Sequence, residues 1–313
     1  MTNSYITMVD KQYVVGIDVG GQTSKIGVVD TRGDVLYQTV IRSDIYGDDA
    51  EAFLAALAKA VKDCIAASGK EGEIRGVGVG APNGNYYTGE VAYAPNLAWA
   101  SKKSVKFAKI LSKNLDGIPV TLTNDANAAA MGEMTYGAAR GMKNFIMITL
   151  GTGVGSGIVI DGNVVYGHDG FAGELGHTTV VRHNGRTCGC GRQGCLEAYC
   201  SARRCSADMG ISLHEFFRRL ERGDVACSAL WDDMLHHLSV AVNNINLALD
   251  CDVVLGGALS YYLPAWLPKL RSYVGERNPF DAEGSFVRLS VLKSHSVPLG
   301  AALYFLRQFV DSI

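Results

Sequence analysis

Short apolar runs separated by glycine and aspartate predict three consecutive β-strands near the start of the chain. The runs cover residues 14–19, 26–29 and 35–41, and turn-forming residues lie between them. The apolar residues between Leu54 and Ile65 then recur at spacings of three and four, which is typical of an amphipathic helix. We therefore expect the chain to begin with a strand meander followed by a helix.

Strands and helices alternate from there to the end of the chain. An alanine-rich helix is expected to start at Asn124-Asp125, directly after a strand. Other strands are expected at 74–79, 119–122, 252–256 and 286–292, and other helices at 107–115, 211–221, 231–249 and 299–310. This alternation predicts a mixed α/β fold.

The first pattern returns later in the chain. A shift of 131 residues places Gly20 on Gly151 and Asp30 on Asp161. In both places a strand, a glycine turn and a second strand are followed by a turn into a third strand. Two glycine hairpins can match by chance, but the order of the surrounding helices and strands repeats as well.

We therefore predict two related α/β halves with a cleft between them. The smaller N-terminal domain would comprise residues 1–122 and 297–313, with the last helix packing back on the first half. The larger domain would comprise residues 123–296 and include an inserted loop rich in glycine and cysteine.

The composition of the 313-residue chain indicates which binding partners and which cellular compartment to expect. Its formal net charge is −2 and it has no basic block, so we expect no nucleic acid. The longest uncharged run, residues 144–160, contains four glycines and is interpreted as two strands, so we expect no membrane span. Eight cysteines in a chain without a secretory signal indicate a reduced compartment, the cytoplasm, and metal or buried thiols rather than disulfides.

Three glycine turns, each at the end of a predicted strand, indicate a site for the phosphates of a nucleotide and for Mg²⁺. Glycines let successive backbone N–H groups point at an anion, and an aspartate at a strand end can hold Mg²⁺ through water. Any one turn could be a plain hairpin, whereas three together favour a nucleotide; the spacing matches neither a P-loop nor a dinucleotide-binding motif. The candidate residues are Asp18, Gly20, Gly21, Thr23, Lys25, Gly151, Thr152, Gly153, Gly256 and Gly257.

Asp125 is a candidate general base. It follows a strand and opens a helix, where the helix dipole favours its ionised form. A carboxylate in this position can accept a proton from a substrate hydroxyl during phosphoryl transfer. The alternative is a helix N-cap, for which aspartate is among the best residues.

One histidine and three cysteines form the most specific motif in the chain. His177, Cys188, Cys190 and Cys195 lie within nineteen residues, and four nitrogen and sulfur ligands suit structural Zn²⁺. His183 is a possible alternative ligand. A set of small buried cysteines, or a redox pair, is the competing interpretation.

Two carboxylates flank this metal loop. Glu174 precedes it and Glu197 follows it, so the loop would hold both carboxylates near one place. Together with Asn96, Asn124 and Asp125 they would supply the oxygen acceptors that a polyhydroxylated ligand requires. Taken alone, each carboxylate is more typical of a solvated surface group.

These motifs together resemble the ROK family of sugar kinases, bacterial glucokinases in particular, over nearly the full chain. The matching segments are Gly16-Ile-Asp-Val-Gly-Gly, Ala94-Pro-Asn-Leu-Ala-Trp, Asn124-Asp-Ala-Asn, Leu150-Gly-Thr-Gly-Val-Gly-Ser-Gly, Gly173-Glu-Leu-Gly-His, Cys188-Gly-Cys-Gly-Arg-Gln-Gly-Cys-Leu-Glu and Leu255-Gly-Gly. Two departures are Gln22, where the family usually has threonine, and Gly80-Ala-Pro-Asn, which lacks a frequent Pro-Gly pair.

The resemblance implies the duplicated actin-like, hexokinase-like (ribonuclease H-like) fold and a homodimer. It implies Asp125 as the base at a sugar hydroxyl. It also implies that Asn96, Asn124, Glu174, His177 and Glu197 surround the sugar, with His177 serving both zinc and sugar.

The expected activity is ATP-dependent phosphorylation of the 6-hydroxyl of glucose. A kinase for another hexose, such as N-acetylmannosamine, shares most of these features. A sugar-responsive transcriptional regulator would need a helix-turn-helix ahead of the kinase fold, and only about a dozen residues precede the first strand here. A sugar-binding protein without catalysis is the third alternative, and Asp125 counts against it.

Overall fold

The computed structural model describes residues 12–310, apart from the side chains of residues 294, 304 and 307–310. Within this part, the chain forms two compact units. The first unit comprises the residues up to Tyr136, the segment Tyr166–Phe171 and the C-terminal part from His295. The second unit comprises Gly137–Val165 and Ala172–Ser294. Residues 123–136 thus lie in the first unit, whereas the expected domain boundary stood at residue 122; the domain boundaries stay a prediction.

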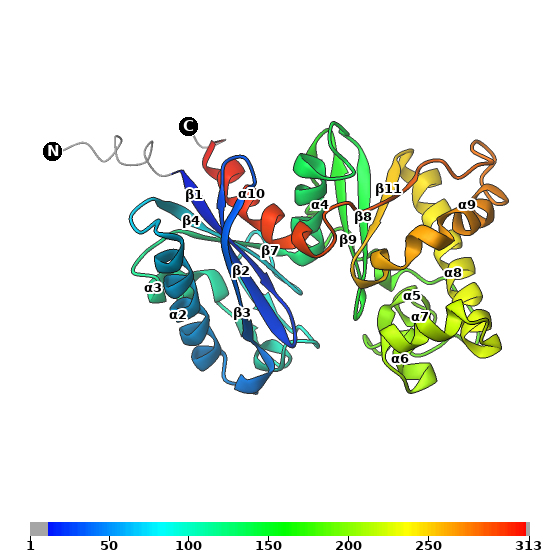
Figure 1. The fold of residues 1–313 in the computed structure, drawn as a ribbon, viewed down its shortest axis with the longest axis horizontal. Helices are drawn as coiled ribbons and strands as arrows, with labels where there is room; N and C mark the ends of the chain where they lie inside the picture. Colours follow the sequence, from blue (N-terminus) through cyan, green and yellow to red (C-terminus); the bar gives the residue numbers. More distant parts are fainter. Residues whose placement is uncertain (1–11, 311–313) are drawn as a thin grey trace. The chain divides into compact units, whose positions relative to one another are not determined.

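The first unit is built on a five-stranded sheet, shown in Figure 1. Its order is β3-β2-β1-β4-β7, in which β1, β2 and β3 are antiparallel and β4 and β7 run parallel to β1. The strands span Tyr13–Val19 (β1), Thr23–Asp30 (β2), Val35–Arg42 (β3), Ile74–Ala81 (β4) and Val120–Asn124 (β7). The predicted meander is confirmed. A separate small ladder pairs β5 (Val91–Ala92) with β6 (Ser104–Val105).

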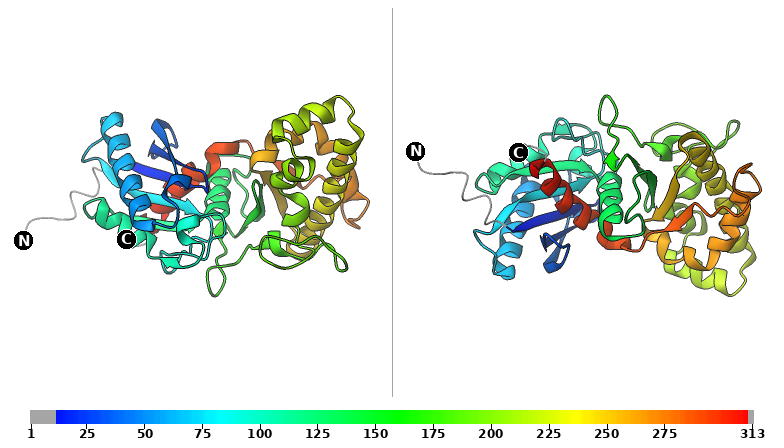
Figure 2. Two further views of the ribbon diagram at one scale, coloured as in Figure 1. Left: turned by 90° about the horizontal axis from the view of Figure 1, so that it is seen from below. Right: turned by 90° about the horizontal axis from the view of Figure 1, so that it is seen from above.

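Helices cover both faces of this sheet. On one face α2 (Ala50–Ser68) and α3 (Phe107–Asn114) bury their apolar stripes against strand residues such as Val15 and Val77. Asp49 caps the start of α2, because its side chain accepts a hydrogen bond from the Ala52 amide. On the other face lies α10 (Ser296–Val310), which packs against α4 (Asp125–Tyr136) (Figure 2). The last helix therefore packs on the first half, as expected.

Glycines in the strands permit the close approach of α10. A Cβ on Gly16 would overlap the Pro298 carbonyl, and a Cβ on Gly78 would overlap the Ala301 carbonyl. Because alternate strand residues face opposite sides of a sheet, the glycines admit the helix while their neighbours fill the other core. Part of the glycine content is therefore explained by helix packing, which the sequence interpretation did not anticipate.

The second unit repeats the topology of the first. Its sheet has the order β10-β9-β8-β11-β12, again with three antiparallel strands followed by two parallel ones. The strands span Phe145–Leu150 (β8), Val154–Ile160 (β9), Asn163–Val164 (β10), Asp252–Gly256 (β11) and Val287–Leu289 (β12). The predicted duplication is confirmed, and with it the mixed α/β, actin-like fold class. The predicted strand at 286–292 is shorter than expected.

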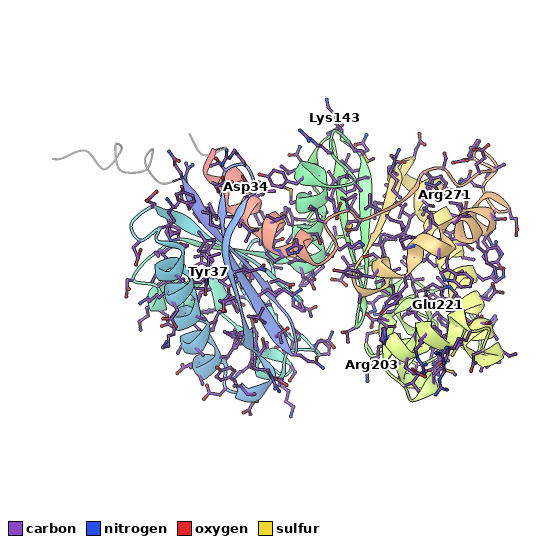
Figure 3. All side chains as sticks on the ribbon, in the orientation of Figure 1. Asp34, Tyr37, Lys143, Arg203, Glu221 and Arg271 are labelled. Carbon is purple, nitrogen blue, oxygen red and sulfur yellow. The ribbon has the colours of Figure 1, made fainter. Side chains whose placement is uncertain are left out.

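Helices of the second unit include three that the sequence interpretation missed. These are α5 (Glu197–Cys200), α6 (Ala202–Met209) and α9 (Leu267–Gly275); α7 (Leu213–Glu221), which follows α6, was predicted. The long helix α8 spans Val225–Leu249 and starts six residues earlier than predicted, because Asp224 caps it by accepting from the Cys227 amide. Arg271 of α9, labelled in Figure 3, donates twice to the Val287 carbonyl and ties α9 to β12.

Among the described residues, no helix combines the length and the apolar character that crossing a bilayer requires. All eight cysteines are free thiols, and Cys190 alone among them is exposed.

Candidate active site

The predicted site residues of the first unit lie at the carboxyl edge of its sheet. In the parallel ladders Asp18 is in register with Gly80, and Gly80 with Thr123, the residue before Asn124. With strands about 4.8 Å apart, the Asp18 and Thr123 backbones are separated by about 10 Å. Asp18, Asn124 and Asp125 are therefore neighbours along one edge, although they are far apart in sequence.

The first glycine turn joins β1 to β2. The Gly20 amide donates to the Thr23 carbonyl over 3.0 Å, so the turn is a closed hairpin end. Burial raises the pKa of Asp18, and Lys25, whose Nζ lies 4.0 Å from Asp18 Oδ2, partly opposes this. A partly buried carboxylate with one distant cationic partner is suited to a further cation such as hydrated Mg²⁺. Thr23 is exposed at the start of β2.

Asn124 and Asp125 have different roles at the start of α4. Asn124 Oδ1 accepts a hydrogen bond from the Ala126 amide at 2.9 Å, the contact expected of an N-cap residue. Asp125 is the first helical residue, and its Oδ1 also accepts from the Ala126 amide. The cap is thus supplied by Asn124, while Asp125 lies in the first turn, where the helix dipole favours a carboxylate.

Asn96 is exposed, and the loop that carries it is held in place by the buried side chain of Trp99. Trp99 is buried and stacks on Phe53 of α2, with ring centroids 4.9 Å apart. A Cβ on Gly21 would lie 2.5 Å from the Asn96 carbonyl oxygen, so the first glycine turn and this loop are in direct contact. The first unit therefore brings Asn96 to the turn that the sequence assigned to phosphate.

The other two glycine turns adjoin each other in the second unit. The Gly151 amide donates to the Gly153 carbonyl over 2.9 Å in the β8–β9 hairpin, and Thr152 is exposed. Gly256 ends β11, which is parallel to β8, and Gly257 has a φ of 79° and packs against the Leu150 backbone. A side chain at position 257 would be strained by the positive φ and would also clash with the Leu150 backbone. Glycine is therefore required there.

His177, Cys188, Cys190 and Cys195 form one cluster in the second unit. Their ligand atoms all lie within 4.8 Å of one another. Cys190 Sγ and Cys195 Sγ are 3.8 Å apart, and Cys188 Sγ is 3.7 Å from His177 Nδ1. Tetrahedral zinc with Zn–S bonds of about 2.3 Å separates its sulfur ligands by about 3.8 Å, so this donor set fits the ion. Burial raises the pKa of the Cys188 thiol to about 12, and a bound cation would displace its proton.

Two carboxylates adjoin the cluster. Glu197 Oε2 accepts from the Val154 amide at 2.9 Å, and its Oε1 lies 3.5 Å from Cys188 Sγ. Glu174 Oε2 lies 3.9 Å from His177 Nε2, the ring nitrogen that does not face Cys188. Burial raises the pKa of Glu174, His177 opposes the shift and the Glu197 charge adds to it. The second unit thus gathers both predicted carboxylates at the cluster.

The structure adds one residue to the candidate site and removes one candidate metal ligand. Ser156, buried in β9, contacts the Gly173 carbonyl through its hydroxyl and accepts from the Leu175 amide, so it fixes the turn that holds Glu174. A lone serine in a glycine-rich strand gave no signal of this in the sequence. Among the described residues, His183 lies outside the cluster, so it is not a fifth ligand.

Comparisons with known proteins cover nearly the whole chain. Residues 14–308 match the model of the ROK family. A glucokinase of Halalkalibacterium halodurans is 31% identical, over 94% of this chain and 94% of that protein. A putative xylose repressor of Caldicellulosiruptor is 29% identical, over 92% of this chain and 76% of the repressor.

Solved structures give the same result. A ROK hexokinase of Thermus thermophilus has a TM-score of 0.79 and 31% identity, covering 96% of this chain and 99% of that one. A ROK family glucokinase of Streptomyces griseus, in complex with glucose and AMPPNP, has a TM-score of 0.76 and 27% identity, covering 93% of this chain and 98% of that one. The expected resemblance is confirmed, and the chain belongs to the ROK family.

Proposed function

We propose that this chain is an ATP-dependent glucokinase. Its class, a sugar kinase that transfers a phosphoryl group to an alcohol, follows from its family and its likeness to glucokinases and a ROK hexokinase over nearly the whole chain. The preferred sugar, the donor and the residue roles are what the proposal adds. The observation that carries the residue roles is the alignment of Asp18 and the Asn124–Asp125 pair at one sheet edge. Glucose as the preferred sugar is proposed from the likeness to glucokinases.

Asp125 is the proposed general base. It accepts the proton of the glucose 6-hydroxyl as that oxygen bonds to the γ-phosphorus and the bond to the bridging oxygen of ADP breaks. Its place in the first turn of α4, after the Asn124 cap, favours the ionised form that a base needs. Because the transition state is loose, most of the rate enhancement comes from positioning and charge stabilisation.

The three glycine turns are the proposed phosphate contacts. They comprise Gly20 and Gly21, Gly151 to Gly153, and Gly256 and Gly257, and each lies at the end of a strand. Thr23 and Lys25 would face phosphate oxygens, and Asp18 would hold Mg²⁺ through water. Mg²⁺ bound with ATP supplies charge neutralisation on the phosphates. The Streptomyces griseus relative binds the ATP analogue AMPPNP, which supports ATP as the donor.

Asn96 and Asn124 of the first unit are proposed sugar contacts, and so are Glu174, His177 and Glu197 of the second unit. Carboxylates and amides that accept from hydroxyl groups suit a hexose, and exclusion of water from the site would protect the phosphoryl group from hydrolysis. His177 would use Nδ1 for the metal and Nε2 for the sugar side, because Nδ1 faces Cys188.

Zinc is the proposed structural ion of the cluster. His177, Cys188, Cys190 and Cys195 would hold it, and the ion would fix the loop between Glu174 and Glu197 without a free coordination position. A homodimer remains a prediction, for which the mass in solution is the direct measurement.

A coupled assay of ADP release tests the proposal. Purified protein is given ATP and Mg²⁺ with glucose, mannose, fructose, allose, N-acetylglucosamine or N-acetylmannosamine. The highest kcat/KM is expected with glucose. A preference for another hexose would replace glucose, and absence of turnover with every sugar would favour the regulator class represented by the xylose repressor.

A further inference from the structure

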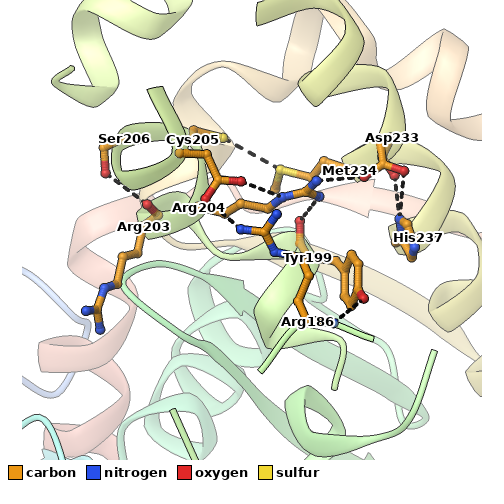
Figure 4. Close-up of polar contacts among 10 residues, drawn as sticks. Arg186, Tyr199, Arg203, Arg204, Cys205, Ser206, Asp233, Met234 and His237 are labelled. Carbon is orange, nitrogen blue, oxygen red and sulfur yellow. Dashed lines mark hydrogen bonds and ion pairs between the residues drawn. The ribbon is translucent and has the colours of Figure 1, made fainter. Parts of the chain in front are cut away.

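We propose that Tyr199 is a positioning residue: together with Arg186 and Arg204 it fixes Glu197 and the loop that carries Cys188. This inference rests on the proposed function, which gives Glu197 its contact with sugar and Cys188 its contact with zinc. Figure 4 shows the contacts of this group, all of which lie within the second unit.

Helix α5 needs external support. It has four residues, Glu197–Cys200, and a single helical turn is not stable by itself. No side-chain hydrogen bond caps its start. The direction in which Glu197 points toward Val154 is therefore set by what the rest of α5 contacts.

Tyr199 supplies the first of these contacts. Its hydroxyl accepts a hydrogen bond from the Arg186 amide at 2.7 Å. Tyr199 is 6% exposed, and its ring stacks on His237 of α8, with centroids 4.2 Å apart and an interplanar angle of 20°. Arg186 precedes Cys188 by two residues and Tyr199 follows Glu197 by two, so one hydroxyl joins the start of the metal loop to α5.

Arg204 supplies the second contact. Its Nη1 donates to the Tyr199 carbonyl at 2.9 Å, and its Nη2 pairs with Asp233 of α8 at 2.7 Å. The Arg204 side chain is 8% exposed, and its guanidinium lies 5.5 Å from the centre of the Tyr199 ring. A cation this buried is held in place by its partners, so Arg204 fixes α5 relative to α8.

Asp208 closes the network. Its Oδ1 accepts from Arg186 Nη2 at 2.6 Å, and its Oδ2 lies 3.5 Å from Arg204 Nε. Arg186 is thus held twice, through its amide by Tyr199 and through its guanidinium by Asp208. None of these attachments uses a predicted metal ligand, so they orient the loop independently of zinc.

Tyr199→Phe tests the inference, because it removes the hydroxyl and keeps the ring. We expect faster amide hydrogen exchange across residues 185–196 and a glucose affinity, measured by calorimetry, weakened by about 3- to 10-fold, the range for loss of one hydrogen bond. The kcat at saturating glucose and the KM for ATP should stay within about 2-fold, since only sugar positioning changes. Tyr273→Phe is the matched control: its hydroxyl donates to Asp232 at 2.7 Å in the same unit, and Tyr273 lies on α9 rather than on α5.

Both changes in Tyr199→Phe are required. The inference would be overturned if Tyr199→Phe matched Tyr273→Phe in the rate of amide hydrogen exchange across residues 185–196 or in its affinity for glucose. If the parent protein neither binds nor phosphorylates glucose, the proposed function fails instead, and the exchange comparison alone then decides whether Tyr199 fixes the loop.

Discussion

Glu197 and Val154 are joined by a hydrogen bond of 2.9 Å from the Val154 amide to the Glu197 carboxylate. Val154 directly follows the glycine turn at 151–153, and the second carboxylate oxygen of Glu197 lies 3.5 Å from Cys188 Sγ. One side chain therefore connects a turn proposed for ATP with a proposed zinc ligand. Sugar, nucleotide and metal sites should respond to changes at this residue to different extents.

Glu197→Gln should separate these roles. The amide oxygen can still accept from Val154, while the charge is lost. We expect the KM for glucose to rise about 10- to 100-fold, the range for a hydrogen bond to a charged acceptor, with the KM for ATP changed by less than about 3-fold. Glu221→Gln, an exposed acid at the end of α7, is the control. An unchanged glucose KM in Glu197→Gln would remove this residue from the sugar site.

Cys190→Ser should lose zinc and stability together. Cys190 is exposed, so without a metal role its replacement should cost under about 0.5 kcal/mol. Elemental analysis should find about one zinc per parent chain and less in the variant, with a lower melting temperature. Cys251→Ser changes a buried thiol outside the cluster and should keep its zinc. A parent protein purified without chelators that contains no zinc would contradict the metal assignment.

Asp18→Asn should raise stability while lowering activity. Burial raises the pKa of Asp18 above its ordinary value of 3.8, so the ionised carboxylate destabilises the folded state above the folded pKa, and this penalty disappears below 3.8. The variant should melt at a higher temperature than the parent at pH 7, and the difference should vanish near pH 4. Its kcat should fall by 10-fold or more if Asp18 holds Mg²⁺. A lower melting temperature at pH 7 would show that the carboxylate is stabilised by partners rather than penalised by burial.

Gly78→Ala should destabilise the first unit. A Cβ there would overlap the Ala301 carbonyl of α10, so helix and sheet must separate, at a cost of about 2–3 kcal/mol. Gly27→Ala is the matched control in the same sheet, because its Cβ would make an ordinary 3.6 Å contact with Val35. Urea unfolding midpoints compare the two, and similar midpoints would argue against close packing of α10.

The duplicated fold could be predicted because its signal is local. Each half begins with a strand, a glycine turn and a second strand, and these patterns can be aligned along the chain. The start of α8 was predicted too late, at residue 231. The turns that directly follow the Asp224 cap carry only a weak apolar stripe, so they gave little sign of a helix. The strand glycines Gly16 and Gly78 were not understood, because they matter only through α10, more than 200 residues away.

The site was predicted where a motif lies in one short segment. The four candidate metal ligands span nineteen residues and meet in one cluster. Tyr199, Arg204 and Ser156 were missed because each acts through a contact with another loop or helix, and an isolated tyrosine, arginine or serine carries no such information. The catalytic and binding roles of the candidate site residues remain predictions, which kinetic measurements on variants must test.

The kcat of Asp125→Asn tests the central claim most directly. Asparagine keeps the size of the side chain but cannot accept the proton, so kcat should fall at least 10²- to 10⁴-fold, the usual contribution of a general base. Calorimetry should still detect glucose binding, and Asp63→Asn, an exposed acid paired with Lys59 on α2, should retain full activity. A kcat in Asp125→Asn within about 3-fold of the parent, with glucose binding intact, would contradict the assignment of Asp125 as the base.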